Sequence, residues 1–342
     1  MRSHALTPAL IVALGIGFAV SPASAQSPAD FYKKTEVSLY VGSGAGGGFD
    51  VYARTLQRHY ARHIPGQPNV VVKNMPGASG LKAMNYIYNV APKDGSAILA
   101  SFNTVVMDHL YGKAGVSFDP RELSWIGSIG KQTGTCLTWH TSPVKTIEDA
   151  QKREVLVGAT GADSTPNIYP KLLNAMIGTK FKVIEGYTTS SLRIAVENGE
   201  IEGLCGIAWE THMASSPSWI LDKKVTFLLQ LGLESSPRLP GVPLALDLIR
   251  NPEDRAVWEL LVVSQEFGRP FVAPPKIPAD RLKALRTAFE ETLKDPQYLA
   301  DAEKTKQFVD PLTGEQIETL LAHAYKSSKQ VVERAKVYAV SN

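Results

Sequence analysis

The chain has 342 residues, with 36 Lys or Arg against 33 Asp or Glu, so its formal net charge is only +3. This balance, without any run of basic residues, argues against a nucleic-acid binder or another polyanion binder. A hydrophobic content of 44% supplies two modest cores.

The N-terminus has the pattern of a secretory signal peptide. Arg2 and His4 precede an apolar stretch from Leu6 to Val20, and an Ala-x-Ala sequence ends at Ala25. The apolar stretch is too short for a comfortable membrane span, so cleavage after Ala25 is favoured over a retained anchor. We expect an exported, periplasmic protein with residues 1–25 removed.

A glycine-rich loop follows the first predicted strand. The strand covers residues 37–41, five glycines lie between Gly42 and Gly48, and a helical pattern covers 49–63. Unpaired N–H groups and the positive end of a helix dipole then point at one place, which favours an anion. The sequence leaves two candidates for it: a nucleotide phosphate or the carboxylate of a small organic acid.

The nucleotide interpretation has a motif, because Gly42, Gly44 and Gly47 satisfy G-x-G-x-x-G. However, the next strand, 69–73, leads into Asn74 where the motif requires an acidic residue for the ribose. Export also separates the protein from free NAD(P). Both points favour the carboxylate, and no cofactor is expected.

Strands and helices alternate along the first part of the chain. A turn at 76–80 opens a helix to about residue 90, and a strand follows at 97–101. Such units predict an α/β fold with a mainly parallel sheet, whose ligand lies beyond the carboxyl ends of the strands. The glycine loop, the turn and Asn103 would meet there.

A second α/β unit begins near residue 125 and repeats the arrangement. Strand 155–158 runs into a loop at 159–167 and then an apolar helix. Two such loops in two units suggest two lobes that face one ligand. Ser164 and Thr165 are also good helix caps, so ordinary capping is the alternative.

The two cysteines, Cys136 and Cys205, lie in apolar, strand-like segments. An even pair in an oxidising compartment favours a structural disulfide, with two buried free thiols as the alternative.

Together these segments resemble the Bug/TctC family of extracytoplasmic solute receptors, the binding subunits of tripartite tricarboxylate transporters. The matching segments, in chain order, are Gly46–Arg54, Val71–Gly80, Ala91–Gly95, Phe118–Pro120, Ser142–Thr146, Gly158–Pro166 and Leu239–Pro243. Each is weak alone, but the ordered set is specific.

The resemblance implies a periplasmic binding protein of the type II class, with two α/β lobes joined by a hinge around the ligand cleft. Lobe 1 is expected to comprise 26–124 and 233–342, and lobe 2 125–232, with hinges near 124–128 and 226–232. It also implies a monomer that captures a di- or tricarboxylate or an aromatic acid and delivers it to membrane permease subunits.

The site residues implied by the resemblance come from both loops and their surroundings. From lobe 1 they are Gly46, Gly47, Gly48, Phe49, Asp50, Ser79 and Asn103. From lobe 2 they are Gly161, Ala162, Asp163, Ser164 and Thr165, with Tyr187 and Trp209 as a possible aromatic wall.

Three of these positions depart from the family pattern. Asp163 replaces a small residue beside an anion site, where it could face solvent, cap the helix or bind an amine or hydroxyl of the ligand. Tyr187 lacks the Lys-Gly that commonly follows it, and Trp209 ends a segment that replaces an acidic strand end. Both aromatic residues could instead belong to the core.

Signals for catalysis are weak, so no enzymatic activity is expected. His59 and His63 have i, i+4 spacing but no third metal ligand nearby, and Ser79 is not in a Gly-x-Ser-x-Gly elbow. An exported hydrolase with an unrecognised site, or a sensor receptor on the same fold, stays as the alternative.

Overall fold

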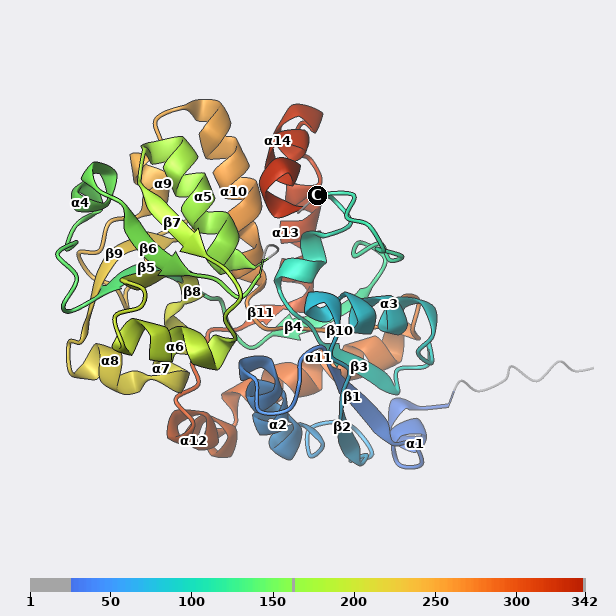
Figure 1. Ribbon diagram of the computed structural model, residues 1–342. Coiled ribbons are helices and arrows are strands. Elements are labelled where there is room, and N and C mark those ends of the chain that lie inside the picture. The colour runs from blue at the N-terminus through green and yellow to red at the C-terminus, as the bar shows by residue number, and fades with distance from the viewer. Residues whose placement is uncertain (1–25, 162–163, 341–342) are drawn as a thin grey trace, which may run out of the picture.

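The computed structural model describes residues 26–161 and 164–340, which form two α/β lobes (Figure 1). Residues 1–25, to which the signal peptide was assigned, lie outside the described residues. Within the described part of the chain, no helix is long and apolar enough to cross a membrane.

Lobe 1 is built on a six-stranded sheet with the order β11-β4-β10-β3-β1-β2. The strand bounds are β1 Val37–Val41, β2 Val70–Asn74, β3 Ala97–Ala100, β4 Ser124–Ser128, β10 Pro270–Ala273 and β11 Leu312–Thr313. β1 pairs in parallel with β2 and β3, as the βα pattern predicted, whereas β10 runs antiparallel to β3 and β4. Side chains of β3 alternate between two core clusters, one on each face of the sheet.

Helices cover both faces of this sheet. The bounds in lobe 1 are α1 Pro28–Tyr32, α2 Gly48–Tyr60, η1 Ala78–Gly80, α3 Leu81–Asn89, η2 Thr104–Met107, α11 Ala279–Lys294, α12 Pro296–Lys304 and α13 Gly314–Ala324. α2, α11 and α12 pack together on one face, and α3 and α13 cover the other. The helices predicted at 49–63 and up to about residue 90 are therefore present, with ends that differ by a few residues.

Lobe 2 contains a five-stranded sheet with the order β7-β6-β8-β5-β9. The strand bounds are β5 Gly134–Trp139, β6 Val155–Gly158, β7 Phe181–Ile184, β8 Gly203–Ala208 and β9 Val225–Leu231. β6 is parallel to β7 and β8, and β5 is antiparallel to β8 and β9.

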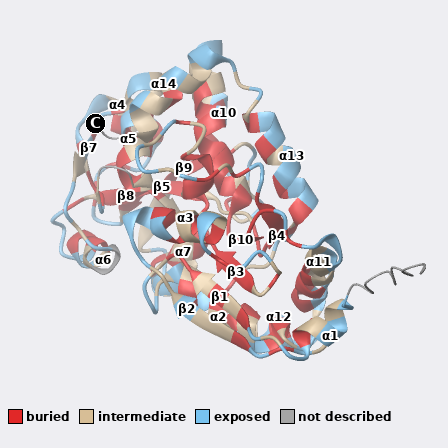
Figure 2. Ribbon diagram, turned by 90° about the vertical axis from the view of Figure 1, so that its right-hand side faces the viewer, coloured by how far each residue is buried: buried red, intermediate tan, exposed pale blue. Residues whose placement is uncertain are grey.

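The remaining helices surround this second sheet. Their bounds are α4 Ile147–Lys152, α5 Thr165–Ile177, α6 Thr189–Glu197, α7 Trp209–Ser215, α8 Pro217–Leu221, α9 Ala245–Leu248, α10 Pro252–Phe267 and α14 Lys329–Ala339. α10 is buried along much of its length (Figure 2). Its buried side chains belong to the largest core cluster, which contains side chains of both lobes. The lobes therefore share one core at the base of the cleft.

The positions where the chain passes between the lobes differ from those expected. β4 was assigned to the second lobe, but Ser124–Ser128 pairs with β10 and β11 in the first sheet. The first crossing therefore lies at 129–133. The second lies at 267–269, because α9 and α10 stay with lobe 2 after β9. A third follows α13, since α14 packs on α10 and α5. The first two crossings touch, since the Ile129 N–H donates to the Arg269 carbonyl at 3.2 Å.

Close packing fixes this junction. Gly268 has a φ of +55°, and a Cβ there would lie 1.7 Å from the Gly130 carbonyl oxygen, so only glycine fits.

The predicted disulfide is present, because Cys136 of β5 and Cys205 of β8 are bonded directly across the two antiparallel strands. It joins two central strands of lobe 2, immediately before the segment 206–208 that faces the cleft. Its role is structural.

Candidate functional site

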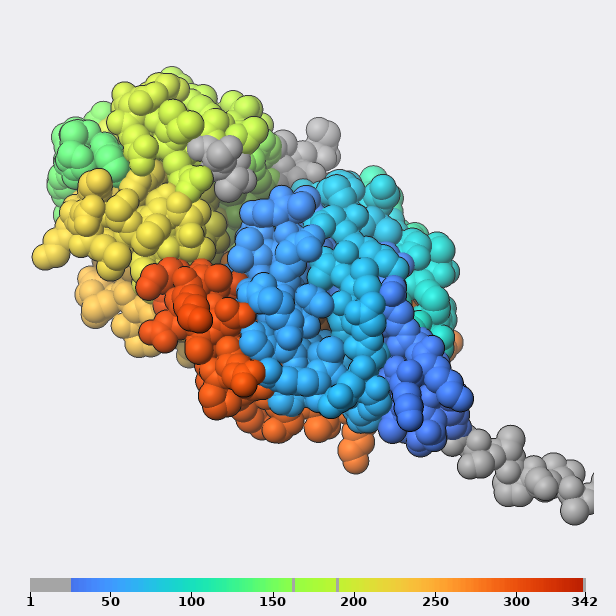
Figure 3. Space-filling view, turned by 90° about the horizontal axis from the view of Figure 1, so that it is seen from below, coloured from blue at the N-terminus to red at the C-terminus, as the bar shows by residue number. Residues whose placement is uncertain are grey.

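A cavity of about 290 Å³ lies between the two lobes, where the carboxyl ends of their parallel strands meet. Figure 3 shows the two lobes from below, as a blue-to-cyan mass and a green-to-yellow mass that meet along one boundary. The cavity is lined by Phe49, Ser79, Phe102, Asn103, Thr104, Gln132, Thr160, Ser164, Thr165, Pro166, Tyr169, Leu192, Gly206, Ile207, Ala208, Thr211 and Gln265. None of the described side chains that line the cavity is charged at neutral pH, and burial raises the pKa of the Tyr169 phenol above its ordinary value.

The glycine loop on the lobe 1 side is held in shape from inside by Asp50. The buried Asp50 carboxylate accepts hydrogen bonds from the Gly46 N–H at 2.8 Å, the Arg54 guanidinium at 2.9 Å and the Asn74 amide at 2.7 Å. Burial alone raises the pKa of Asp50, but the hydrogen bonds outweigh it and the pKa lies below its ordinary value. Asp50 therefore stays charged and shapes the loop.

This arrangement also explains why Asn74 is found where a nucleotide site would need an acidic residue. Asn74 occupies the strand end where a ribose-binding acid was required, and its amide also donates to the Ser43 carbonyl at 3.0 Å. Asn74 is part of the loop support. The end of β2 therefore supports the glycine loop and presents no carboxylate to a ribose at this position.

Three N–H groups at the start of α2 are available to a ligand. The N–H of Gly47 is already bonded to the Gly44 carbonyl at 3.3 Å. By contrast, the N–H groups of Gly48, Phe49 and Asp50 have no acceptor among the described residues, and Gly47 provides no side-chain cap. The first turn of a helix leaves such groups unpaired, and its dipole favours negative charge there. The start of α2 is an anion-binding position.

A buried arginine adds positive charge behind this position. Arg269 is 5% exposed, and its guanidinium lies over the rings of Tyr52 at 3.9 Å and Phe49 at 4.9 Å. Burial lowers the pKa of Arg269 and Tyr52 opposes the shift, yet an arginine stays protonated. The guanidinium also lies close to the backbone of Gly48, because a Cβ added to this glycine would be 3.8 Å from the Arg269 Nη1.

The carboxylate near Arg269 is Glu210 of α7, from the other lobe. Glu210 is 2% exposed, accepts from the Thr133 N–H at 3.0 Å and lies 3.5 Å from Arg238. Burial raises the pKa of Glu210, while the Thr133 N–H and the two arginines oppose this shift. Two guanidinium groups share one carboxylate, so this junction carries a net positive charge behind the cleft.

The 76–80 turn brings Ser79 to the cavity through unusual backbone angles. Gly77, Ala78, Ser79 and Gly80 have φ values of +143°, +46°, +50° and +92°. A side chain on Gly80 would collide with the Phe102 ring, at 2.6 Å. Non-glycine residues with positive φ are uncommon and cluster at ligand sites. The backbone strain is consistent with a functional position for Ser79.

The lobe 2 loop before α5 is constructed differently. The Ser164 carbonyl accepts from the Asn167 and Ile168 N–H groups, and Pro166 has no N–H to offer. The Thr165 hydroxyl donates to the Gly206 carbonyl at 2.7 Å. Most N–H groups at the start of α5 are therefore paired or missing, and this side of the cleft presents mainly hydroxyl and apolar groups.

Neutral amides form the floor of the cleft. The Asn103 amide donates to the Ser264 carbonyl at 2.9 Å and to the Gln132 side chain at 3.3 Å. The Gln265 amide donates to the Tyr169 hydroxyl at 3.2 Å, and its oxygen accepts from the Gly134 N–H. This network links both lobes beneath the cavity without a charged group.

The structure brings together some of the predicted site residues. Phe49, Ser79, Asn103, Ser164 and Thr165 all line the cavity. The predicted residues that do not line it are Gly46, Gly47, Gly48, Asp50, Gly161, Tyr187 and Trp209. Ala162 and Asp163 lie outside the described residues. The lining residues that were not predicted come mainly from lobe 2, where the end of β8 and the start of α7 supply Gly206, Ile207, Ala208 and Thr211. Others are Gln132 of the crossing at 129–133 and Gln265 of α10, and neither of these segments carries a motif.

Both aromatic candidates pack away from this cavity. The buried Trp209 ring lies 4.7 Å from the ring of Phe308 in lobe 1. The Arg238 guanidinium lies 5.8 Å from the centre of the Trp209 ring. Tyr187 packs against the core cluster that contains Leu192. Trp209 is therefore an inter-lobe contact and Tyr187 a core-edge residue in this structure.

His59 of α2 and His63 just after this helix contact α12 and its N-cap residue. His59 contacts Asp301 and His63 contacts Asp295, each at 2.9 Å. Among the described residues no group of three or more His, Cys, Asp or Glu side chains could hold a metal ion.

Two lobes with a shared base, a cleft at their strand ends and an anion position on one side define the class of two-lobed solute-binding proteins. Comparisons with known proteins agree. The sequence profile of the "Tripartite tricarboxylate transporter family receptor" (TctC) family matches residues 52–337. The chain belongs to this family, whose members are receptors of tripartite transporters.

Individual relatives are distant but span the whole chain. The "UPF0065 protein in gbd 5'region" of Cupriavidus necator is 25% identical over 345 residues, 97% of each chain. A TctC solute-binding protein from Polaromonas superposes with a TM-score of 0.65, at 17% identity, over 89% of this chain and 99% of its own. MatC from Rhodopseudomonas palustris, solved with malate, has a TM-score of 0.64 at 17% identity, with 90% and 99% covered. The structural likeness confirms the two-lobed fold.

Proposed function

We propose that this protein is a periplasmic receptor that captures a small carboxylate in the cleft between its lobes. The observation that carries this proposal is the start of α2, where Gly48, Phe49 and Asp50 offer three unpaired N–H groups beside a cavity of about 290 Å³. The malate in the structure of MatC supports the same ligand class.

In this mechanism the open receptor first binds the carboxylate at the start of α2. The Gly46 and Gly47 N–H groups and the Asp50 carboxylate shape the loop, and Arg269 adds positive potential from behind. Micromolar affinity requires about 8 kcal/mol, a magnitude that oriented N–H donors and partial desolvation can supply.

Lobe 2 then closes over the ligand. Its contribution comes from the loop Gly161, Ala162, Asp163, Ser164 and Thr165, and Ser79 and Asn103 complete the lobe 1 side. Closure uses the paired crossings at 129–133 and 267–269 as the hinge, where the chain passes between lobes. Tyr187 and Trp209 support the second lobe around this loop.

The receptor acts as a monomer and delivers its ligand to membrane permease subunits, and the description of the family as a transporter receptor supports this delivery. Export follows from the pattern of residues 1–25, with cleavage after Ala25. The ligand leaves chemically unchanged.

Calorimetric titration with mono-, di- and tricarboxylates, aromatic acids and NAD(P) tests this function. We expect at least one carboxylate to bind and NAD(P) to give no heat. Binding of NAD(P) without any response to carboxylates would contradict the proposal, and steady turnover of an ester or amide would point to a hydrolase instead.

A matched pair of variants tests the proposed carboxylate position at the start of α2. Gly48 is the first residue of α2, a position that tolerates proline, and Gly47 before it is extended with a ψ of 161°. Gly48→Pro removes one N–H while the helix is kept, and we expect carboxylate affinity to fall at least tenfold. Gly48→Ala keeps the N–H and should bind within about threefold of the unmodified protein.

A further inference from the structure

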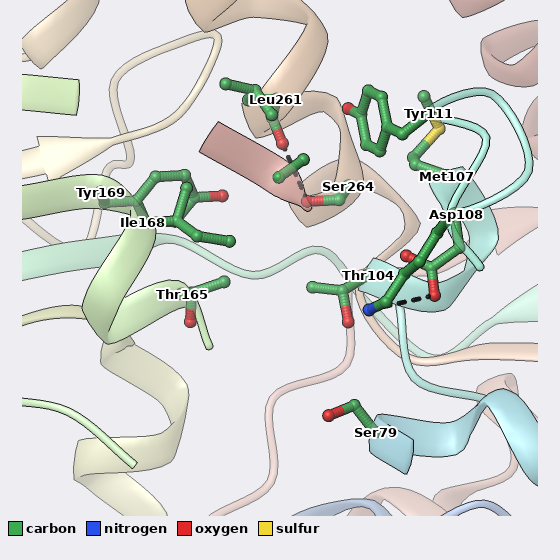
Figure 4. A pocket seen from close by; sticks show the side chains of 12 residues that line it. Ser79, Thr104, Met107, Asp108, Tyr111, Thr165, Ile168, Tyr169, Leu261 and Ser264 are labelled. Carbon is green, nitrogen blue, oxygen red and sulfur yellow. Dashed lines mark hydrogen bonds and ion pairs between the residues drawn. The ribbon is translucent and has the colours of Figure 1, made fainter. Parts of the chain in front are cut away.

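A second, smaller cavity of about 50 Å³ adjoins the cleft. Ser79, Thr104, Thr165 and Tyr169 line both cavities, so the smaller one opens from the larger. Figure 4 shows it between the Ile168 side of α5 and the side chains of η2 and α10.

The walls of the smaller cavity are mainly apolar. Met107, Ile168 and Leu261 contribute aliphatic or thioether surface. Its polar groups are largely satisfied within the protein, since the Tyr111 hydroxyl donates to the Leu260 carbonyl and the Ser264 hydroxyl to the Leu261 carbonyl, both at 3.1 Å. A hydrocarbon group fits this surface better than a polar one.

One ion pair borders the smaller cavity. The Lys113 ammonium lies 3.6 Å from the Asp108 carboxylate, and both residues line the cavity. A second carboxylate placed there would meet Asp108 together with Lys113, so the pair provides no net attraction for it.

The rest of the cleft, as far as the described residues form it, also lacks a second anion position. No described residue that lines the larger cavity has an acidic or basic side chain. At the start of α5, Asn167 and Ile168 donate to Ser164 and Pro166 has no donor. An additional carboxylate in the cleft would lose its water without a matched group of donors.

We propose that the ligand is a monocarboxylate whose aliphatic or aromatic tail extends into the smaller cavity. This inference rests on the proposed carboxylate function and narrows it, since the same fold accepts malate, a dicarboxylate, in MatC. The carboxylate lies at the start of α2, the Phe49–Phe102 pair, with ring centroids 4.4 Å apart, lies beside the tail, and the end of the tail contacts Met107, Ile168 and Leu261.

The test titrates the full exported protein, at pH 7.5, with two matched pairs of probes. The first pair is hexanoate and adipate, and the second is 3-phenylpropionate and 3-(4-carboxyphenyl)propionate. In each pair the second acid adds a carboxylate at the far end. We expect the tighter-binding monocarboxylate to exceed its dicarboxylate partner by at least tenfold in affinity.

The outcomes separate the two proposals. Dicarboxylates that bind as tightly as their partners, or more tightly, would overturn the monocarboxylate inference and leave the carboxylate receptor intact. A protein that binds no carboxylate in either this set or the wider screen would overturn the proposed function, and the inference with it.

A variant pair locates the tail. Ile168→Lys places a cation beside the smaller cavity, and we expect monocarboxylate affinity to fall at least fivefold while the partner dicarboxylate gains. Ile177→Lys, at the far end of the same helix, should change neither. If Ile168→Lys folds normally by circular dichroism and leaves both affinities unchanged, the tail does not reach this cavity.

Discussion

The two loops that face the cleft look alike in sequence but differ in their hydrogen bonds. Before α2, Gly47 offers no cap, and three N–H groups stay open. Before α5, the Ser164 carbonyl accepts from two N–H groups and Pro166 removes a third. Asp50 fixes the first loop through its side chain, whereas hydroxyl and carbonyl groups fix the second.

The comparison shows that a strand–loop–helix unit is an anion site only when its donors are unused. Both loops have the glycine and small-residue composition that suggests anion binding. Among the described residues, only the first leaves the first three N–H groups of its helix free and has a buried guanidinium behind it. We therefore expect the first loop to determine affinity for the carboxylate and the second to act as a neutral cover.

The largest effect is expected from Asp50→Ala. The change removes the acceptor of the Gly46 N–H and leaves the Arg54 and Asn74 donors without their partner. We expect carboxylate binding to be lost and the free energy of unfolding to fall by about 2 kcal/mol. Calorimetric titration and urea denaturation measure the two quantities.

The matched change in the second loop is Asn167→Ala. Asn167 is fully buried and its amide donates to Glu185 at 2.6 Å, so stability should also fall. Because this side is expected to act as a cover, affinity should stay within about threefold. Equal loss of binding in both variants would remove the distinction between the loops.

A smaller effect is expected from Arg269→Gln. The guanidinium lies behind Gly48 and Phe49 without lining the cavity, so it acts through its field and by positioning Phe49. We expect carboxylate affinity to fall about tenfold, or about 1.4 kcal/mol. The loss should be greater in low salt than in high salt if it is partly electrostatic.

Arg238→Gln is the control for this change. Arg238 also lies near Glu210, but its guanidinium is over Trp209 and Phe308 at the edge of the inter-lobe contact. The variant should bind the carboxylate within about threefold of the unmodified protein. A tenfold loss here would assign the effect to Glu210 and not to charge behind the loop.

The sequence was sufficient for the parts of the molecule that local patterns determine. Strand 37–41, the helix after the glycine loop and strand 155–158 appear where periodicity predicted them. The cysteine pair was also predicted correctly, because compartment and even number favour a bond. The ordered motifs identified the family that the profile match shows.

Other features depend on contacts between distant segments, which local patterns do not reveal. Ser124–Ser128 pairs with β10, about 145 residues later, so its lobe could not be assigned from neighbouring sequence. Gln265 lies in the last turn of α10 and Arg269 just after this helix, and neither residue belongs to a motif. Arg269 appears beside the glycine loop only because β10 inserts next to β3.

Acid should weaken the first loop. The pKa of Asp50 lies below 3.8 in the folded protein, because hydrogen bonds outweigh the effect of burial. A lowered folded pKa stabilises the protein fully above the unfolded value, and this stabilisation is lost as the pH falls through the folded value. Stability should therefore decline below about pH 4.

Urea denaturation of ligand-free protein between pH 5 and pH 2.5 measures this decline. Asp295, whose pKa is lowered to about 2, contributes in the same direction. The Asp50→Asn variant, which cannot titrate at this position, should lose less stability over the interval than the unmodified protein. Identical slopes would mean that Asp50 does not carry the acid sensitivity of the loop.

The smallest effect is expected when the two helix caps are changed alike. In Ser164→Ala the carbonyl that accepts from Asn167 and Ile168 is kept, and only the hydroxyl bond to Gly161 at 2.6 Å is lost. The free energy of unfolding should fall by less than about 1 kcal/mol, and affinity should change less than threefold. In Gly47→Ala the new Cβ lies 3.3 Å from the Gly44 carbonyl oxygen that accepts from Gly47 itself. That contact displaces the loop, so the affinity of Gly47→Ala should fall more than that of Ser164→Ala, because the ligand depends on the first helix start and not on the second.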